Sequence, residues 1–326
     1  MILVAGGSGF FGLNIARCLS NRGEKVLLVQ RHAIKQPSLL APYWDKQIKQ
    51  ATGSILDLSF IIGLVRTYKV DSIIHAAAET KGWRDTVPKG AVLDPRGWHI
   101  HERFETEVVG TVNCLEATRL MDLRRMVYIS SCDNYRGLPE QPKLFHEDAY
   151  LPPVAYSPDG NNKRAADLQG FLYAKGYGVS YVSVRLGSNF GYGCDWTLVN
   201  KMINSALEGK SLDLSIVPSN RRTHIVYAKD SAEGTSELLL AKKSLKHHIY
   251  NLAAGVNPTM QEIVDTIKEV IPGAQIKLGP PSDGKEDNLV DRPQTMDRIK
   301  KEVGFVPMTM KQGIEHYVNF KKTGEY

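Results

Sequence analysis

The chain has 326 residues, of which 42% are hydrophobic and 23% are charged, with a formal net charge of +6. This composition is typical of a globular chain with a large core, organised as one large domain or as two unequal lobes. No apolar stretch approaches the roughly 18 residues that a membrane helix needs, so we expect no membrane partner. The positive charges are spread along the sequence, which favours a small anionic ligand over nucleic acid.

The start of the sequence and its cysteines bear on the compartment and on metal binding. No charged segment, apolar core or cleavage site precedes the first predicted strand, so we expect a cytoplasmic protein. The cysteines are far apart and form no Cys-x-x-Cys pair, so we expect reduced structural thiols and no metal site. They are Cys18, Cys114, Cys132 and Cys194.

The first twelve residues, MILVAGGSGFFG, are the most informative part of the chain. A buried-strand pattern leads directly into Gly6, Gly9 and Gly12 and then into a helical run. Gly6 permits a tight turn, Gly9 lets the backbone approach a pyrophosphate, and Gly12 allows close packing of the helix on the strand. The N–H groups at the start of the helix would face the phosphates. The pattern predicts a dinucleotide site, to which we also assign Phe10 and Phe11.

The next elements alternate between strands and helices. Short β-branched runs predict strands at residues 25–30, 72–75, 126–130 and 180–185, and apolar spacing predicts helices at 60–68, 104–121 and 161–175. This alternation is typical of an α/β fold with a doubly wound parallel sheet covered on both faces. Beyond residue 187 the sequence is richer in loops, with shorter helices near 197–207 and 260–270, which indicates a smaller lobe.

Several of these segments, in this order, resemble the extended short-chain dehydrogenases/reductases of the NAD-dependent epimerase/dehydratase family. The resemblance covers nearly the whole chain and includes IIHAAA at 73–78, GTVN at 110–113 and VYISS at 127–131. It implies a Rossmann-type domain at residues 1–187, joined by segments around 223–253, and a mainly substrate-binding lobe at 188–326. It also implies a homodimer that pairs through the helices at 104–121 and 161–175.

The choice of cofactor depends on the end of the second strand. A carboxylate there would bind the ribose of NAD and repel a 2′-phosphate, but Gln30 stands in its place, followed by Arg31 and His32. This pair can neutralise a phosphate, so we expect NADP rather than NAD, unless Arg31 is only a solvated loop residue. By resemblance, further cofactor contacts come from Ser54, Ile55, Ala76, Ala77, Ala78 and Lys163.

The resemblance also assigns the chemistry to the ends of the central strands. Ser131 lies four residues before Tyr135, the spacing of the family's hydroxyl residue, so it is expected to polarise a substrate carbonyl. Lys163 matches the lysine that bonds the nicotinamide ribose. The family's tyrosine is absent, because Asp159 stands four residues before Lys163.

Two aspartates are candidates for the missing proton-transfer group. An aspartate has an ordinary pKa of about 3.9, so we expect Asp159 to form an ion pair with Lys163, with proton transfer as the alternative. Asp133 follows Ser131 by two residues, where the related dehydratases place an acid; otherwise it is a solvated loop residue. Tyr156 would share the helix face of Lys163 only in a helix that began early, which Pro158 and its neighbours disfavour.

The later part of the chain supplies candidate substrate contacts. By resemblance, Arg222 binds a substrate diphosphate, although it is also placed to pair with a carboxylate such as Asp291. Tyr135, Asn189 and Tyr192 are assigned to the same cleft.

Two departures from the family pattern lie earlier in the chain. An insertion at 81–101, with Trp83, Arg84, Trp98, His99 and His101, is either a peripheral loop or the wall of a pocket for a bulky ketone. Glu107 replaces an asparagine that supports the long helix.

These residues lead to an expected function. We expect an NADP-dependent oxidoreductase that reduces a ketone by hydride transfer, since net reduction needs only one proton and the usual tyrosine is missing. The first alternative is a nucleotide-sugar epimerase or dehydratase. The second is a non-catalytic NADP-binding protein with a regulatory or scaffolding role. The sequence does not name the substrate.

Overall fold

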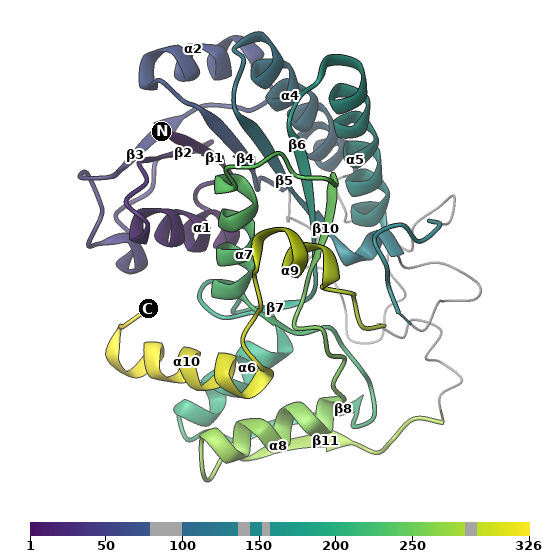
Figure 1. Ribbon diagram of the computed structural model, residues 1–326. Coiled ribbons are helices and arrows are strands. Elements are labelled where there is room, and N and C mark those ends of the chain that lie inside the picture. Colours follow the sequence, from purple (N-terminus) through teal and green to yellow (C-terminus); the bar gives the residue numbers. More distant parts are fainter. Residues whose placement is uncertain (79–99, 136–143, 152–156, 284–291) are drawn as a thin grey trace.

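The computed structural model describes residues 1–78, 100–135, 144–151, 157–283 and 292–326. A parallel seven-stranded sheet with the order β10-β6-β5-β4-β1-β2-β3 lies at its centre (Figure 1). Its strands are β1 (Ile2–Ala5), β2 (Val26–Gln30), β3 (Ile48–Thr52), β4 (Ser72–His75), β5 (Arg125–Ser131), β6 (Tyr181–Leu186) and β10 (Ile249–Leu252). This order confirms the predicted doubly wound α/β fold. In such sheets the ligand crevice opens where the strand order reverses, here between β1 and β4.

Helices cover both faces of the sheet because successive side chains of each strand point to opposite sides. In β1, Ile2 and Val4 join the core formed with α1 (Phe10–Asn21), α7 (Ala228–Leu240) and α9 (Asp297–Val303). Leu3 and Ala5 join the opposite core, under α2 (Leu58–Tyr68), α4 (Gly110–Leu120) and α5 (Pro158–Tyr177). The sheet is therefore buried on both sides, as its apolar strands predict.

The predicted strands agree with the observed ones to within one residue at each end, whereas two predicted helices need correction. The helix expected from residue 161 begins at Pro158, because proline is tolerated in the first turn, where its missing N–H is not needed. Ser157 caps it by accepting a hydrogen bond from the Gly160 N–H at 3.0 Å. The helix expected at 104–121 is three segments, namely α3 (Ile100–Phe104), the π-helical turn η3 (Glu105–Val109) and α4.

The chain after residue 187 contributes to two layers. β10, α7 and α9 return to the main sheet, while the rest builds a second lobe below it (Figure 1). In that lobe, β7 (Asn189–Phe190) pairs with β9 (Val226–Tyr227), and β8 (Leu212–Pro218) pairs with β11 (Ile276–Gly279). Its helices are α6 (Leu198–Leu207), α8 (Met260–Val270) and α10 (Met310–Thr323). Two short helices elsewhere are η1 (Ser38–Leu40) and η4 (Cys132–Tyr135).

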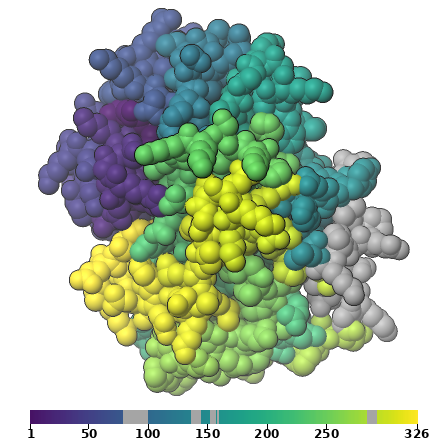
Figure 2. Space-filling model, viewed as in Figure 1, coloured from purple at the N-terminus to yellow at the C-terminus, as the bar shows by residue number. Residues whose placement is uncertain are grey.

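The C-terminal end of the chain ties the second lobe to the first. Figure 2 shows the last residues, in yellow, against the purple N-terminal segment. The hydroxyl of Tyr326 donates to Asn14 Oδ1 on α1 at 2.6 Å. Among the described residues, none of the helices combines the length and the apolar character needed to cross a membrane.

Candidate active site

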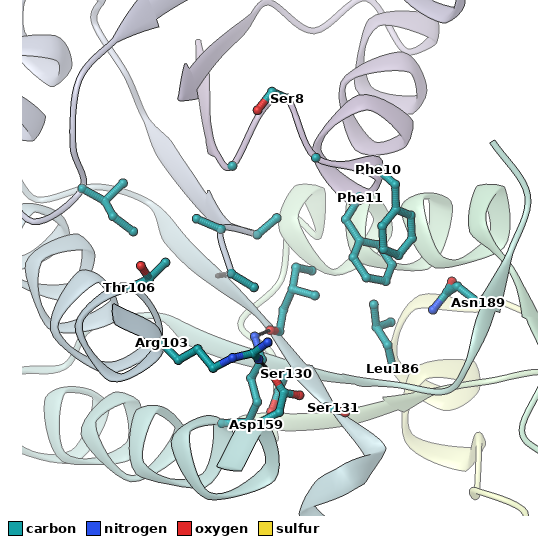
Figure 3. A pocket seen from close by; sticks show the side chains of 18 of the residues that line it. Ser8, Phe10, Phe11, Arg103, Thr106, Ser130, Ser131, Asp159, Leu186 and Asn189 are labelled. Atoms are coloured by element: carbon teal, nitrogen blue, oxygen red, sulfur yellow. Dashed lines mark hydrogen bonds and ion pairs between the residues drawn. The ribbon is translucent and has the colours of Figure 1, made fainter. Parts of the chain in front are cut away.

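A cleft of about 680 Å³ opens at the carboxyl ends of β1, β4, β5 and β6. Its lining joins the glycine turn after β1 to the first residues of the second lobe (Figure 3). All the residues of the predicted cofactor site except Gly12 and His32 line it, together with Ser131, Asp133, Asp159 and Asn189. The cleft therefore brings together most of the residues that the sequence assigned to cofactor and chemistry.

The glycine turn is shaped so that backbone, not side chains, faces the cleft. Gly6 has a φ of 82°, and a Cβ atom there would lie 2.6 Å from the backbone of Ala77. A Cβ atom on Gly12 would lie 2.3 Å from the Gly6 carbonyl oxygen. Gly9 caps α1 with no side-chain hydrogen bond, which leaves the first N–H groups of the helix open to an anion. These features fit the pyrophosphate of a dinucleotide.

The end of β2 lies at the far side of the cleft. Gln30 is buried and its amide donates to Gln50 Oε1 at 3.0 Å, while its own Oε1 accepts no hydrogen bond within the described part of the chain. Arg31 is exposed and lines the cleft; His32 is exposed but lies outside the lining. The Ser54 hydroxyl accepts from the Leu56 N–H at 3.2 Å. An uncharged acceptor and an exposed guanidinium therefore take the place of a carboxylate.

Ser131 and Asp133 belong to one hydrogen-bonded corner of the cleft. Ser131 ends β5 and its hydroxyl accepts from the Asp133 N–H at 3.1 Å. The Asp133 carboxylate accepts from the Ser157 hydroxyl at 3.0 Å. The serine that caps α5 thus links η4 to α5 across the floor of the cleft, and fixes the orientation of Asp133.

Lys163 and Asp159 do not form the predicted ion pair with each other. Lys163 Nζ donates to the Ile129 carbonyl at 2.9 Å and lies 3.9 Å from Glu107 Oε1. Asp159 Oδ1 instead lies 3.8 Å from Arg103 Nη1, and Figure 3 shows the two side chains pointing toward each other beside Ser130 and Ser131. The reason is tertiary: α3 and η3 pack on α5 and bring a cation and an acid that the sequence spacing within α5 cannot reveal.

The position of Lys163 depends on how α5 is fixed to the sheet. Asp167, one turn further along α5, is buried and accepts hydrogen bonds from Ser183 at 2.6 Å and Asn134 at 3.0 Å. It also pairs with the buried Arg185 guanidinium at 3.2 Å. Since buried charges persist only when they are paired and hydrogen-bonded, this network holds α5 in one register on β6.

Of the four residues predicted to contact the substrate, only Asn189 lines the cleft in the described part of the structure. Asn189 lines the cleft, with its amide donating to the Gly187 carbonyl at 2.8 Å. Tyr135 is 1% exposed and donates to Asn251 Oδ1 at 2.7 Å, so the predicted cleft contact of Tyr135 is wrong. Tyr192 and Arg222 lie outside the lining of the cleft as far as the structure describes it.

These two outlying residues have partners elsewhere. The Tyr192 carbonyl accepts from the Asn14 side chain at 3.0 Å, and its ring packs edge-on against Phe320. The exposed Arg222 guanidinium donates to the Asn257 carbonyl at 2.7 Å. Asp291, its predicted alternative partner, lies outside the described residues, as do Trp83, Arg84, Trp98, His99 and Tyr156.

Sequence reasoning missed several residues of the cleft. Arg103 and Thr106 reach it from α3 and η3, and Trp196 from the second lobe, where its ring packs edge-on against Phe10 at 5.2 Å. One feature of the sequence pointed to this part of the cleft: Glu107 stands where the family that the chain resembles has an asparagine. It marks the segment that packs against the start of α5.

Comparison with known proteins gives a consistent result along the whole chain. Residues 2–253 match the NAD dependent epimerase/dehydratase family. The UDP-glucuronate 4-epimerase of Thermodesulfobacterium geofontis is 24% identical over 98% of this chain and 95% of its own length. The dTDP-glucose 4,6-dehydratase of Mycolicibacterium smegmatis is 29% identical over 69% of this chain and 64% of its own length.

Solved structures show the same fold. The dTDP-glucose 4,6-dehydratase of Bacillus anthracis in complex with NAD superposes with a TM-score of 0.78 at 22% identity, covering 99% of this chain and 97% of that one. The UDP-glucose 4-epimerase of Thermotoga maritima with UDP-glucose also gives a TM-score of 0.78, at 18% identity, covering 99% of both chains.

Proposed function

The chain belongs to the NAD-dependent epimerase/dehydratase family, and from this premise we propose that it transforms a nucleotide sugar by transient oxidation of a sugar carbon. This is the first alternative of the sequence analysis rather than its leading expectation of a ketone reductase. The relatives' names support it, since they act as epimerases and dehydratases of UDP- and dTDP-sugars. A redox-neutral reaction also returns the cofactor to its starting state, so no second reductant is needed.

One observation carries the proposal: a single cleft holds both the glycine cradle and a set of polar side chains at the ends of β5 and α5. The cradle binds the pyrophosphate of a nicotinamide dinucleotide, which supplies reversible hydride acceptance when bound. Ser131, Asp133 and Asp159 line the other part of the cleft, where a sugar ring would lie. Cofactor and substrate are thereby held side by side.

The chain's own residues then have distinct tasks. The Ser131 hydroxyl donates to the oxygen of the reacting carbon and stabilises the carbonyl as it forms. Lys163 is held by Ile129 and contributes positive charge near the nicotinamide ribose. Asp133, held by Ser157, is the candidate acid for a dehydration at the neighbouring carbon.

The test uses the purified full chain with bound cofactor and a panel of UDP-glucose, UDP-glucuronate and dTDP-glucose, followed by NMR of the sugar. We expect one substrate to give an epimer or a 4-keto-6-deoxy product without net consumption of dinucleotide. Ser131→Ala should lower turnover by about 10²-fold with unchanged cofactor binding, because one oxyanion donor is lost. Net consumption of reduced cofactor would instead assign a reductase, and cofactor binding without any product would favour a regulatory role.

A further inference from the structure

The start of α5 and the turn η3 bring two carboxyl groups together beneath the cleft. Asp159 lies in the first turn of α5 and lines the cleft with its side chain 30% exposed. Glu107 lies in η3, directly behind it, and is 0% exposed. The two side chains adjoin each other, so one acid faces the substrate space and the other is closed off from water.

The surroundings of Glu107 leave its carboxyl group short of donors. Within the described part of the chain, no donor forms a hydrogen bond to either of its carboxyl oxygens. Lys163 Nζ is 3.9 Å from Oε1, beyond hydrogen-bond length, and gives its short contact to Ile129. Because Glu107 is fully buried, has no donor and adjoins a second acid, a proton shared with Asp159 is the group that satisfies it, since like charges at such close range disfavour ionisation of both acids.

Other groups around the pair set its charge. Burial, with the adjacent carboxylate of Asp159 adding to it, raises the pKa of Glu107 well above its ordinary range, against the opposing charges of Lys163 and Arg103. Burial lowers the pKa of His75 to about 3 and raises the pKa of Tyr128, so both are neutral at pH 7. The charged groups that face the pair are therefore Lys163 and Arg103, which offset the negative charge left when the proton departs.

We propose that Glu107 and Asp159 hold one proton between them in the resting site, and that Asp159 takes up a second proton from the hydroxyl on the reacting carbon of the substrate and later returns it. This rests on the proposed function and supplies the group that the missing tyrosine would provide. Glu107 acts through Asp159 and is a positioning residue. The π-helical turn is the local feature that directs it toward α5, and such turns often occur at functional sites.

The proton balance follows from these charges. When the substrate carbon is oxidised, its hydroxyl proton passes to Asp159, so that each acid of the pair then carries one proton, while the hydride that leaves the same carbon would be taken up by a bound nicotinamide dinucleotide. In the return step the pair gives the proton back to the carbonyl oxygen as the carbon regains hydride. No proton is gained or lost overall, which suits a redox-neutral reaction.

The first experiment observes the proton without substrate. Infrared difference spectra are taken at pH 7 on cofactor-loaded protein that carries Asp230→Asn, so that the buried Asp230 contributes no acid band. With Glu107 intact, these spectra should show the carbonyl stretch of a buried carboxylic acid. Glu107→Gln should remove it, while Glu116→Gln, a change at a half-buried residue of α4 outside the lining of the cleft, should leave it unchanged. Absence of this band, or its persistence in Glu107→Gln, overturns the shared proton even if the protein proves to be an epimerase.

The second experiment follows the pH dependence of turnover on the accepted nucleotide sugar. The unmutated chain should lose rate at high pH, where the pair gives up the proton that the raised pKa of Glu107 retains. Glu107→Gln has no such proton to lose, so the midpoint of this loss should move by at least one pH unit or disappear, with KM unchanged. Asp159→Asn should lower turnover by about 10²–10⁴-fold. An unmoved pH midpoint in a folded Glu107→Gln variant would show that Glu107 is only structural. If no sugar turns over, the proposed function fails. The infrared result still shows whether Glu107 and Asp159 share a proton.

Discussion

At the end of β2, Gln30 and Arg31 determine what a bound nucleotide ribose would meet. The solved relatives described above include a complex with NAD, whereas the local chemistry of this chain lacks the carboxylate that repels a 2′-phosphate. We expect NADPH to bind more tightly than NADH by about 1–3 kcal/mol, the range of a charge-assisted contact. Calorimetric titration of both cofactors at moderate salt measures the difference.

Arg31→Ala should abolish this preference, because the exposed guanidinium is the charge that would meet the phosphate. Lys35→Ala, a nearby change outside the lining of the cleft, is the matched control and should leave both affinities unchanged. Equal or tighter binding of NADH by the unmutated chain would instead assign NAD as the cofactor.

Single residues were predictable where their role is set by local backbone. The glycine turn is such a case, since the spacing of the glycines in the sequence already indicates the positions at which a Cβ atom would not fit. The partner of Lys163 was not predictable in this way, because Glu107 lies on another helix and reaches Lys163 only through tertiary packing. Tyr135 likewise shares the spacing of a site residue, but its position two residues beyond Asp133 places its ring in the core against Phe145.

Among the elements, α7 carries a buried acid in its first turn. Asp230 is 2% exposed and accepts a hydrogen bond from the Met308 N–H at 3.0 Å, which ties α7 to the segment before α10. Burial raises the pKa of Asp230 to about 7, although the Met308 N–H opposes this. Because the folded protein then binds the proton more tightly than the unfolded chain, this group's contribution to stability falls as pH rises from about 4 to about 7.

Asp230→Asn keeps an acceptor for Met308 and removes the charge. We therefore expect the variant to gain on the order of 2 kcal/mol over the unmutated protein at pH 8 and little at pH 4. Urea denaturation at the two pH values measures this, with the exposed Asp265→Asn as the control. A gain of the same size at both pH values would show that the titration of Asp230 does not contribute.

Elements were predictable where periodicity is unbroken. The central strands follow from their buried runs, but the helix expected at 104–121 contains a π-helical turn whose extra residue changes which side chains face outward. By apolar spacing alone, Val108, Val112 and Leu115 could either form a helix–helix interface between two copies or pack on the sheet. In the structure Val108 and Leu115 are buried, and Leu115 belongs to the core under the sheet.

At the scale of the whole molecule, one apolar surface has no covering within the described chain. It lies on α3, η3, α4 and α5, which pack beside one another on one face of the sheet (Figure 1). Its exposed side chains include Leu168 at 64% and Leu172 at 59% on α5, and Phe104 at 46% and Val109 at 37% beside them. Exposed apolar side chains gathered on neighbouring helices are typical of interaction sites, and a second copy of the chain would present the same surface to them.

We therefore expect a homodimer that pairs through these helices. Light scattering at micromolar concentration should give twice the mass of one chain. The double change Leu168→Glu and Leu172→Glu should halve that mass, because it places charges one helical turn apart on the most exposed apolar side chains of α5, where the partner would exclude water. Ile216→Glu, at a residue 76% exposed on β8 in the second lobe, is the matched control and should remain dimeric. A single-chain mass for the unmutated protein would mean that this surface serves another purpose; a dimer that survives the double change would place the interface on a different face.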